Sequence, residues 1–361
     1  MPLKLAFFTY PQAFQNIGGG EIQLLKTKEF LEKAGQPVHL FDLWKDRVES
    51  FDFIHIFSSV ADTLGVAKAA RSRGVAVGVS PVLWSDWHRA LHTDGSVRLK
   101  ADLLLRHAMK VLAPTFPSAR RKLLVTADAL FPNSEIEKKQ IQRLFAIPGE
   151  KIHVVYNGVD SEFSRADAES FRKQCPGKPF VLCVGRIEPR KNQFNLIMAL
   201  QHVPDIRLVL IGSPVSGYET YYDACQREGR GFTEFIPTLS HQDALLKSAY
   251  AACETLVLPA WFETPGLAAL EGALAGAKIV LTQGGSTQEY FGDRVLYCDP
   301  ASRRSIRQAI EASRKLKPDH SLKNHVEKHY IWERVAERYL EVYQRVLTNR
   351  RASLQLSASK L

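Results

Sequence analysis

Two carboxylates, Glu263 and Glu271, lie in the stretch PAWFETPGLAALEGALAGAKIVLT (259–282), which otherwise consists mainly of small and apolar residues. The preceding run TLVLPA predicts a buried strand. A helix is predicted to begin at Pro265 or Gly266, because both residues suit a first helical turn. Glu263 then lies in the turn and Glu271 on the helix. Ligands of open α/β sheets bind beyond the carboxyl ends of the strands, so this turn is a candidate site.

The pair of carboxylates predicts recognition of hydroxyl groups around an anion. The free N–H groups at the start of the helix attract an anion. Neither carboxylate should contact that anion, because like charges repel, but each can accept hydrogen bonds from hydroxyl groups beside it. A nucleotide sugar fits, since its diphosphate has a ribose at one end and a hexose at the other. The alternative interpretation is that Glu263 stabilises the helix dipole and Glu271 is solvated.

A second strand end, VGRIEPRKNQ (184–193), gathers the cations Arg186, Arg190 and Lys191 in one short loop. Such a cluster suits a diphosphate, because guanidinium can bind oxygens bidentately and ammonium acts as a point charge. The alternative is a solvated basic turn paired with Glu188. Taken alone, Arg190 is better explained by that alternative.

A third loop, NIGGGEIQLL (16–25), follows the first predicted strand and opens a helix. Gly18, Gly19 and Gly20 would let backbone N–H groups approach an anion at the helix N-terminus. The loop lacks the spaced G-x-G-x-x-G pattern of dinucleotide-binding enzymes, which weakens the interpretation as a Rossmann oxidoreductase. The alternative is a turn that needs positive φ angles.

These loops belong to a pattern of short apolar runs separated by amphipathic stretches, which predicts parallel sheets covered on both faces. The predicted strands of the first half are LKLAFFT (3–9), PVHLFD (37–42), FDFIHIF (51–57), VAVGVS (75–80), MKVLAP (109–114) and ADALFP (127–132). Those of the second half are FVLCVGR (180–186), IRLVLIGS (206–213), FTEFIP (232–237), TLVLPA (255–260), KIVLTQ (278–283) and RVLYC (294–298). We therefore expect two Rossmann-like, doubly wound α/β domains.

A length of 361 residues also favours two domains. We expect an N-terminal domain over residues 1–165 and a C-terminal domain over 166–340, with the junction in the polar stretch 157–179. Residues 341–361 are expected to end the last helix and form a basic tail, of which SLQLSASKL is predicted to be disordered.

The composition excludes several classes of protein. No apolar run is long enough to span a bilayer and no signal peptide is recognisable, so we expect a cytoplasmic protein. The net charge of +10 is spread over both halves, which argues against a nucleic-acid-binding arm. Local basic stretches at 106–124 and 348–361 are either solvated surface or attract a phosphorylated acceptor or anionic lipid at the inner face of the membrane. The cysteines are expected to be buried and reduced: Cys175, Cys183, Cys225, Cys253 and Cys298.

The E-x7-E arrangement in ETPGLAALE after LVLPAWF resembles the signature of retaining glycosyltransferase family 4. Segments similar to those of the family occur in the same order: GGGE (18–21), FPNSEIEKKQI (131–141), VVYNGVD (154–160), VGRIEPRKNQ (184–193) and GGSTQEYFGDRVLYCDP (284–300). The resemblance covers most of the chain and is weakest between residues 40 and 125. It implies a GT-B fold, in which two Rossmann-like domains face each other across a cleft and the C-terminal helix often crosses back to the first domain.

The resemblance also implies roles for individual residues. Arg186 and Lys191 would hold the donor diphosphate, and Glu263 would contact the transferred sugar near the backbone N–H groups of Gly266 and Leu267. Glu271 would accept hydrogen bonds from the ribose, and the loop of Gly18, Gly19 and Gly20 would adjoin the donor. The acceptor would be a hydroxyl group of a glycan or lipid-linked sugar, as in polysaccharide biosynthesis.

Two features limit what the resemblance implies. Many relatives carry a His after the fourth strand of the first domain, whereas this chain has Ser80 there, with Trp84 and His88 following as candidate sugar or acceptor contacts. No D-x-D sequence occurs, so we expect transfer without a metal, and no cofactor beyond the donor substrate. The alternatives left open are a GT-B epimerase or phosphorylase and a non-catalytic nucleotide-binding protein.

Overall fold

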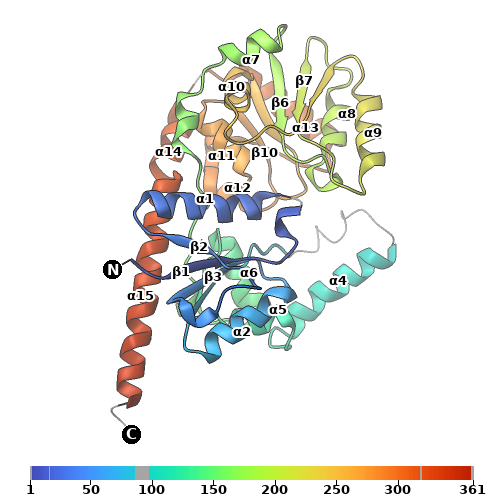
Figure 1. Cartoon of the computed structure of the whole chain (residues 1–361). Helices are drawn as coiled ribbons and strands as arrows, with labels where there is room; N and C mark the ends of the chain where they lie inside the picture. Colours follow the sequence, from blue (N-terminus) through green and yellow to red (C-terminus); the bar gives the residue numbers. More distant parts are fainter. Residues whose placement is uncertain (1, 16, 86–96, 318, 359–361) are drawn as a thin grey trace. The chain divides into compact units, whose positions relative to one another are not determined.

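The chain folds into two compact α/β units in a computed structural model that describes residues 2–15, 17–85, 97–317 and 319–358 (Figure 1). Unit 1 comprises Met1–Ser85, Leu105–Asn157 and Trp332–Leu361, and unit 2 comprises Asp86–Leu104 and Gly158–Ile331. Each unit contains one parallel sheet covered by helices on both faces, as the apolar strand runs predict.

Unit 1 is built on a five-stranded parallel sheet in the order β2-β1-β3-β4-β5. Its strands are β1 (Leu5–Phe8), β2 (Val38–Leu40), β3 (Phe53–Phe57), β4 (Ala76–Ser80) and β5 (Ala129–Leu130). Its helices are α1 (Gly19–Lys33), α2 (Leu64–Ser72), α5 (Ala119–Thr126), α6 (Glu135–Phe145) and α15 (Trp332–Ala358). Helix α4 (Val97–Leu112) begins in the part assigned to unit 2 and ends in unit 1.

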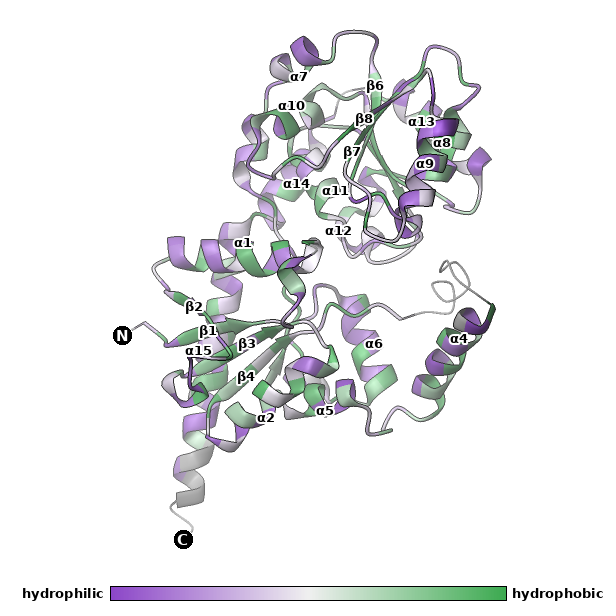
Figure 2. Cartoon of the chain, turned by 45° about the vertical axis from the view of Figure 1, so that its right-hand side comes forward, coloured by the Kyte–Doolittle hydropathy of each residue, from purple (hydrophilic) through white to green (hydrophobic). Residues whose placement is uncertain are grey.

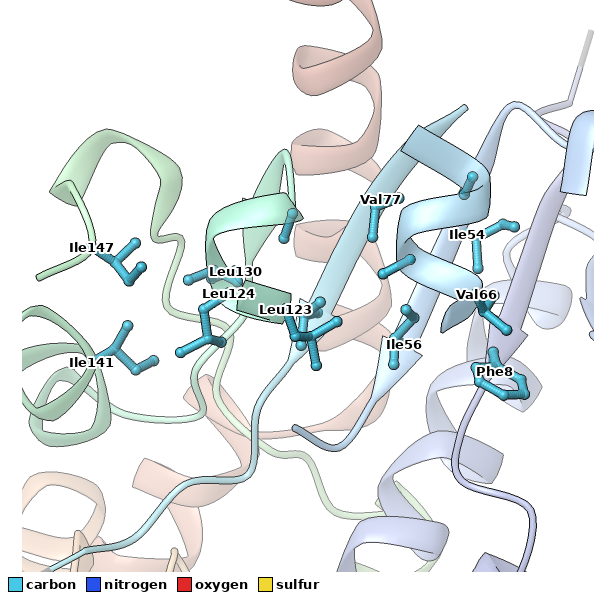
Figure 3. Close-up of a cluster of buried hydrophobic side chains, with 14 of the residues drawn as sticks. Phe8, Ile54, Ile56, Val66, Val77, Leu123, Leu124, Leu130, Ile141 and Ile147 are labelled. Atoms are coloured by element: carbon cyan, nitrogen blue, oxygen red, sulfur yellow. The ribbon is translucent and has the colours of Figure 1, made fainter. Parts of the chain in front are cut away.

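The sheet of unit 1 separates two apolar layers. On one face, side chains of α2, α5 and α6 pack against the strands. Figure 3 shows Val66, Leu123 and Ile141 of these helices together with strand residues such as Phe8, Ile54 and Val77. On the other face, α1 and α15 supply Phe30, Trp332 and other buried side chains. The strands β1, β3 and β4 are buried along their whole length, which explains why they read as continuous apolar runs.

Unit 2 is built on a six-stranded parallel sheet in the order β11-β10-β9-β6-β7-β8. Its strands are β6 (Phe180–Val184), β7 (Arg207–Ile211), β8 (Thr233–Ile236), β9 (Thr255–Leu258), β10 (Ile279–Thr282) and β11 (Leu296–Cys298). Its helices are α7 (Glu169–Gln174), α8 (Gln193–Leu200), α9 (Glu219–Glu228), α10 (Ala244–Ala252), α11 (Leu267–Leu274), α12 (Thr287–Phe291), α13 (Arg303–Lys315) and α14 (Ser321–His329). Strand order reverses between β6 and β9, which is the switch point of a doubly wound sheet.

The structure corrects three predictions about elements. MKVLAP (109–114) is not a strand, because its first residues complete α4. The predicted C-terminal domain ends too late, since the segment from Trp332 belongs to unit 1, where Tyr339 and Tyr343 are fully buried. The tail was predicted to be disordered from Ser353, but α15 continues through Ala358. The apolar residues of α15 that pack on the sheet of unit 1 extend from Trp332 to Leu347.

The cysteines are free thiols, as predicted, but not all are buried. Cys183, Cys225 and Cys298 are buried, whereas Cys175 and Cys253 are half-buried. Burial raises the pKa of the Cys183 thiol to about 12, so this group stays protonated at neutral pH.

Candidate functional site

The switch point of unit 2 brings together two loops that the sequence singled out separately. Strands β6 and β9 are adjacent and parallel, with Leu182 paired to Leu256, so their carboxyl ends lie at the same edge of the sheet. The basic loop follows β6 and the loop with Glu263 follows β9. Ligands of doubly wound sheets bind in the crevice at such a reversal.

The centre of this site is an ion pair between the two loops. Lys191 Nζ donates to Glu263 Oε1 at 2.6 Å, and the side chains are only 18% and 5% exposed. Burial lowers the pKa of Lys191 below its usual value, while the Glu263 carboxylate opposes that shift. A nearly buried ammonium and carboxylate in contact strongly stabilise each other's charge, because little water screens them.

The backbone of Glu263 is fixed by the loop after β10. Its N–H donates to the carbonyl oxygen of Gly284 at 3.1 Å, and its carbonyl oxygen accepts from the Ser286 N–H at 2.9 Å. A Cβ added at Gly285 would lie 1.9 Å from the Glu263 carbonyl oxygen, and the φ angle of Gly285 is +103°. Only glycine fits there, because a side chain would clash and the conformation is left-handed.

A single asparagine ties the basic loop to its neighbours. Asn192 is buried, and its Nδ2 donates to the carbonyl oxygens of Pro259 and Pro300, each at 2.9 Å. These carbonyls follow β9 and β11. The three loops are therefore held as one unit, and the position of Lys191 next to Asn192 is fixed with them.

The two arginines of the basic loop differ in their surroundings. Arg190 donates from Nη2 and Nε to Glu188 Oε1 at 3.0 and 3.2 Å. It also lies over the Phe262 ring, 5.2 Å from the centroid. The alternative interpretation of Arg190 as paired with Glu188 is confirmed. Arg186 lies farther from Glu188, at 3.4 Å, and its side chain is 38% exposed, so it is the more accessible guanidinium.

Helix α11 begins one or two residues later than predicted. Gly266 is its N-cap, with a φ angle of +87°, and Leu267 is its first residue. A Cβ at Gly266 would lie 3.4 Å from Glu263 Oε2, so the carboxylate lies against the start of the helix. This arrangement agrees with the stabilisation of the helix dipole that the sequence offered as an alternative for Glu263.

Glu271 is buried, not solvated, and has two side-chain partners that the sequence did not indicate. Its Oε2 accepts from the hydroxyl of Tyr250 at 2.6 Å, and its Oε1 lies 2.6 Å from His241 Nδ1. Burial and the neighbouring carboxylate raise the pKa of Tyr250 well above its usual value, which keeps this hydroxyl a donor. Each carboxylate oxygen has a further lone pair, so Glu271 is held in place and can still accept from a ligand.

The glycine loop of unit 1 has ordinary backbone angles. Gly18 is the N-cap of α1 with a φ angle of −135°, and neither Gly19 nor Gly20 has a positive φ angle, so the alternative of a left-handed turn is wrong. Glu21 Oε2 accepts from the Gly18 N–H at 2.8 Å, and Oε1 accepts from the Tyr10 hydroxyl at 2.8 Å. A Cβ at Gly19 or Gly20 would meet nothing within 4 Å, so their surroundings are open.

The predicted contacts in the segment after β4 receive no support from the structure. Ser80 is fully buried, and its hydroxyl lies 2.9 Å from His55 Nε2 and 3.4 Å from the Tyr339 hydroxyl. It therefore helps to bind α15 to the sheet of unit 1 and is not available to a sugar. Trp84 is half-buried, and His88 lies outside the described residues.

Sequence reasoning missed a buried carboxylate in unit 1. Glu137 in α6 accepts from the Leu83 N–H at 2.6 Å and from the Asn133 N–H at 2.8 Å. Ser134, the N-cap of α6, accepts from the Glu137 N–H at 3.1 Å, so the start of the helix fixes the position of this carboxylate. The S-x-x-E spacing could have revealed it, whereas nothing in the sequence links Glu271 to His241 and Tyr250.

Two further properties of the described residues concern metal binding and membrane spanning. They contain no group of three or more His, Cys, Asp or Glu side chains that could hold a metal ion. None of the described helices is both long and apolar enough to cross a membrane.

Two family models match consecutive parts of the chain. The model described as "Glycosyltransferase Family 4" matches residues 22–163, and the model described as "Glycosyl transferases group 1" matches residues 166–329. The second match contains the whole site at the switch point of unit 2. The parts of the chain outside both matches are mainly strand β1, the glycine loop that follows it, and helix α15.

Individual relatives match the chain in part. The D-inositol 3-phosphate glycosyltransferase of Mycobacterium sp. (strain KMS) is 30% identical over 199 residues, which is 53% of this chain and 45% of that protein. The O-antigen chain mannosyltransferase B of Escherichia coli is 30% identical over 207 residues, or 54% and 52% of the two chains. The chain thus spans about half the length of these relatives.

Solved structures resemble the fold over nearly the whole chain. Sucrose-phosphate synthase from Thermosynechococcus elongatus has a TM-score of 0.77 at 17% identity, covering 96% of this chain and 100% of that one. Anabaena Alr3699/HepE in complex with UDP-glucose has a TM-score of 0.70 at 16% identity, covering 95% and 99%. The two parallel α/β units, the E-x7-E site and both family matches lead to one conclusion: the chain belongs to glycosyltransferase family 4, a family of retaining hexosyltransferases with the GT-B fold.

Proposed function

We propose that this protein transfers a hexose from a nucleoside-diphosphate sugar to a hydroxyl group of a glycan or glycolipid acceptor, with retention and without a metal ion. The observation that carries the proposal is the meeting of Lys191, Arg186 and two buried carboxylates at the strand reversal of unit 2. In this proposal unit 2 binds the donor, and the acceptor binds to unit 1.

The diphosphate is assigned to the cations of the loop after β6. Arg186 is the more accessible guanidinium, and Lys191 is a nearly buried ammonium. The N–H groups of Gly266 and Leu267 at the start of α11 add partial positive charge. As the bond between the sugar and the phosphate breaks, negative charge grows on the diphosphate, and preorganised cations lower the energy of that step.

The hexose is assigned to Glu263. This carboxylate already contacts Lys191, so a bound diphosphate and sugar would share the two groups, the phosphate with Lys191 and a sugar hydroxyl with Glu263. In the proposed reaction the acceptor oxygen attacks the anomeric carbon on the face that the phosphate leaves. The leaving phosphate oxygen takes the acceptor proton, so no separate strong base is required.

The ribose is assigned to Glu271. Tyr250 and His241 hold its carboxylate in one orientation before any ligand binds. Such preorganisation lowers the entropy cost of binding a ribose hydroxyl group. UDP-glucose is the first donor to test, because the similar structure of Anabaena Alr3699/HepE contains it. GDP-mannose and ADP-glucose should be tested beside it, because none of the residues assigned to the diphosphate, hexose or ribose identifies the base.

Thermal unfolding of the full chain with each intact nucleotide sugar tests the donor assignment. At least one donor should raise the midpoint temperature, since a ligand that binds only the folded state stabilises it. Glu271→Ala should lose that increase, while Lys173→Ala, a change at an exposed cation of the same unit, should keep it. NAD is added in a parallel sample to test the alternative of a Rossmann oxidoreductase. If no nucleotide sugar stabilises the protein, or if NAD alone does, the proposal is wrong.

Product analysis then separates transfer from the alternatives. With the stabilising donor and a panel of glycan acceptors, we expect a glycoside of retained configuration and one nucleoside diphosphate for each glycoside. Release of nucleotide and free sugar without any acceptor would indicate an epimerase. Dependence on inorganic phosphate or pyridoxal phosphate would indicate a phosphorylase.

A further inference from the structure

Helix α4 presents an apolar stripe to solvent. Leu105, Met109 and Leu112 are 61%, 43% and 84% exposed, and Phe116, just beyond the helix end, is 56% exposed. The spacing of four and three residues places Leu105, Met109 and Leu112 on one side of the helix. Val97 continues the stripe toward the N-terminus and is 85% exposed. Figure 2 shows hydrophobic and hydrophilic residues alternating along α4.

The opposite side of α4 makes only limited contact with unit 1. Val111 is partly buried against the apolar core, and His107 Nδ1 lies 3.3 Å from the Ser85 hydroxyl. Among the described elements, no helix or strand packs extensively on α4. A helix that exposes a continuous apolar stripe in a soluble domain usually marks an interaction surface.

The charges around the stripe are positive. Arg98 and Arg106 are exposed on α4, and the segment 106–124 contains no Asp or Glu. The cations of α4 itself are Arg98, Lys100, Arg106 and Lys110. Asp102 is the single acid of α4. A second copy of this chain on the same face would bring like charges together, since a twofold interface is self-complementary.

We propose that α4 docks this protein on the surface of an anionic lipid bilayer, with Leu105, Met109, Leu112 and Phe116 inserted at the interface. An interfacial helix of this kind buries its apolar side among the lipid chains, and its cations attract the negatively charged headgroups. The proposal does not depend on the reaction assigned to unit 2. It gives the cations of α4 a binding partner. It does not extend to Arg120 and Arg121, which donate to the carbonyl oxygens of Ser59 and Phe145, or to the basic stretch 348–361.

Vesicle co-sedimentation of the full chain tests the proposal. The vesicles contain phosphatidylcholine alone or with 30 mol% phosphatidylglycerol, at low and high salt. The protein should sediment with the anionic vesicles and stay in solution with the neutral ones. High salt should weaken binding, because it screens the attraction between the cations and the headgroups. Absence of binding to anionic vesicles at low salt, or equal binding to both kinds, overturns the proposal.

Two sets of variants test the stripe and the cations separately. Leu105→Gln with Leu112→Gln should weaken binding to anionic vesicles at least tenfold. Trp44→Gln is the matched control, because Trp44 is 95% exposed and lies outside α4, and it should bind as the wild type does. Arg98→Gln with Arg106→Gln keeps the stripe intact and should weaken binding roughly fivefold for each cation at low salt.

Independent readouts keep the result interpretable. Thermal unfolding and UDP binding should be the same in the variants and the wild type, because no changed residue belongs to the site of unit 2. Wild-type affinity in both sets of variants would contradict the proposal. So would concentration-dependent dimerisation by light scattering that the leucine variant abolishes, because the stripe would then bind a second copy.

Discussion

Both units contain a doubly wound parallel sheet, but the loops at their strand reversals carry different chemical groups. In unit 2, the reversal between β6 and β9 carries an ion pair, accessible Arg186 and a carboxylate held by two partners. In unit 1, the reversal between β1 and β3 carries Gly18 to Gly20, and the nearby Glu21 accepts from its own chain. At this position unit 2 therefore presents charged side chains held in place by their neighbours. Unit 1 presents glycine backbone with open space around Gly19 and Gly20.

The buried carboxylates sharpen this contrast. Glu263 has a cation as its partner, whereas Glu137 in unit 1 accepts from the backbone N–H groups of Leu83 and Asn133. Burial raises the pKa of Glu137 to about 7, although those N–H groups oppose the shift. Lys191 supplies an opposite charge beside Glu263, whereas Glu137 has hydrogen bonds from backbone N–H groups but, among the described residues, no such cation in contact.

The largest effect is expected for Lys191→Ala. Turnover should fall about 10²–10³-fold, since a preorganised cation aimed at developing charge is lost. Lys191→Arg should restore activity only in part, because the guanidinium fork has a different shape. Initial rates with the donor found by screening measure both effects, with and without excess EDTA. Abolition of wild-type activity by EDTA and its return with magnesium or manganese would refute the metal-free mechanism.

The ion pair requires a second variant as a control for Lys191→Ala. Removing the lysine leaves the Glu263 carboxylate in its buried site without this cation, which costs stability of roughly 3–5 kcal/mol for a buried pair. Glu263→Gln combined with Lys191→Ala should recover part of the unfolding free energy but none of the turnover. Recovery of turnover as well would mean that Lys191 only neutralises the Glu263 carboxylate and that neither charge is needed for transfer.

A smaller effect is expected for Glu271→Ala, which should weaken binding of the nucleoside diphosphate by about 1.5–3 kcal/mol, the range for a hydrogen bond to a charged group.

Glu263→Ala should instead lower turnover more than the affinity for the nucleoside diphosphate, since the free nucleotide lacks the hexose. Tyr250→Phe should weaken nucleotide binding by about 0.5–1.5 kcal/mol, because Glu271 loses one of its positioning donors. Titration calorimetry measures the three affinities, with Tyr222→Phe as a control, and initial rates measure the turnover of Glu263→Ala. Equal affinity in wild type and Glu271→Ala would remove the ribose assignment.

A pH-dependent effect is expected in unit 1 for Glu137→Gln. The folded-state pKa of Glu137 is raised to about 7 from 4.5, so its contribution to stability is present below pH 4.5 and is lost as pH rises through 7. Between pH 5 and pH 8 the wild type should lose about 2–3 kcal/mol of unfolding free energy relative to Glu137→Gln. Urea unfolding at both pH values measures the difference, and Glu135→Gln on the same helix is the control. A difference independent of pH would contradict the raised pKa.

The smallest effect is expected for Gly20→Ala. The unfolding free energy should stay equal or rise by about 0.5–1 kcal/mol, because alanine favours the helix and its Cβ meets open space. Donor or acceptor binding should weaken if a ligand approaches the backbone there. Gly65→Ala in α2 is the matched control, since its Cβ also meets nothing within 4 Å. Unchanged binding and turnover in Gly20→Ala would leave the glycine loop without a role in the site.

Most elements of unit 2 could be predicted from the sequence. Its strands are short apolar runs bounded by turn residues, and these local signals place all of β6 to β11 within the predicted runs. In unit 1, MKVLAP looked like a strand because a few apolar residues in a row fit both periodicities. The structure resolves that ambiguity with a helix, whose stripe of apolar residues is visible only over a longer window.

The sequence by itself determined the two loops and the types of residue that they carry, because strand ends, glycines and charged residues are local features. Only the tertiary structure decided that β6 lies beside β9, which brings Lys191 to Glu263. It also decided that Tyr250 and His241 hold Glu271. These contacts join residues far apart in the chain, and they form because the order of strands and the burial of apolar surface are properties of the folded whole.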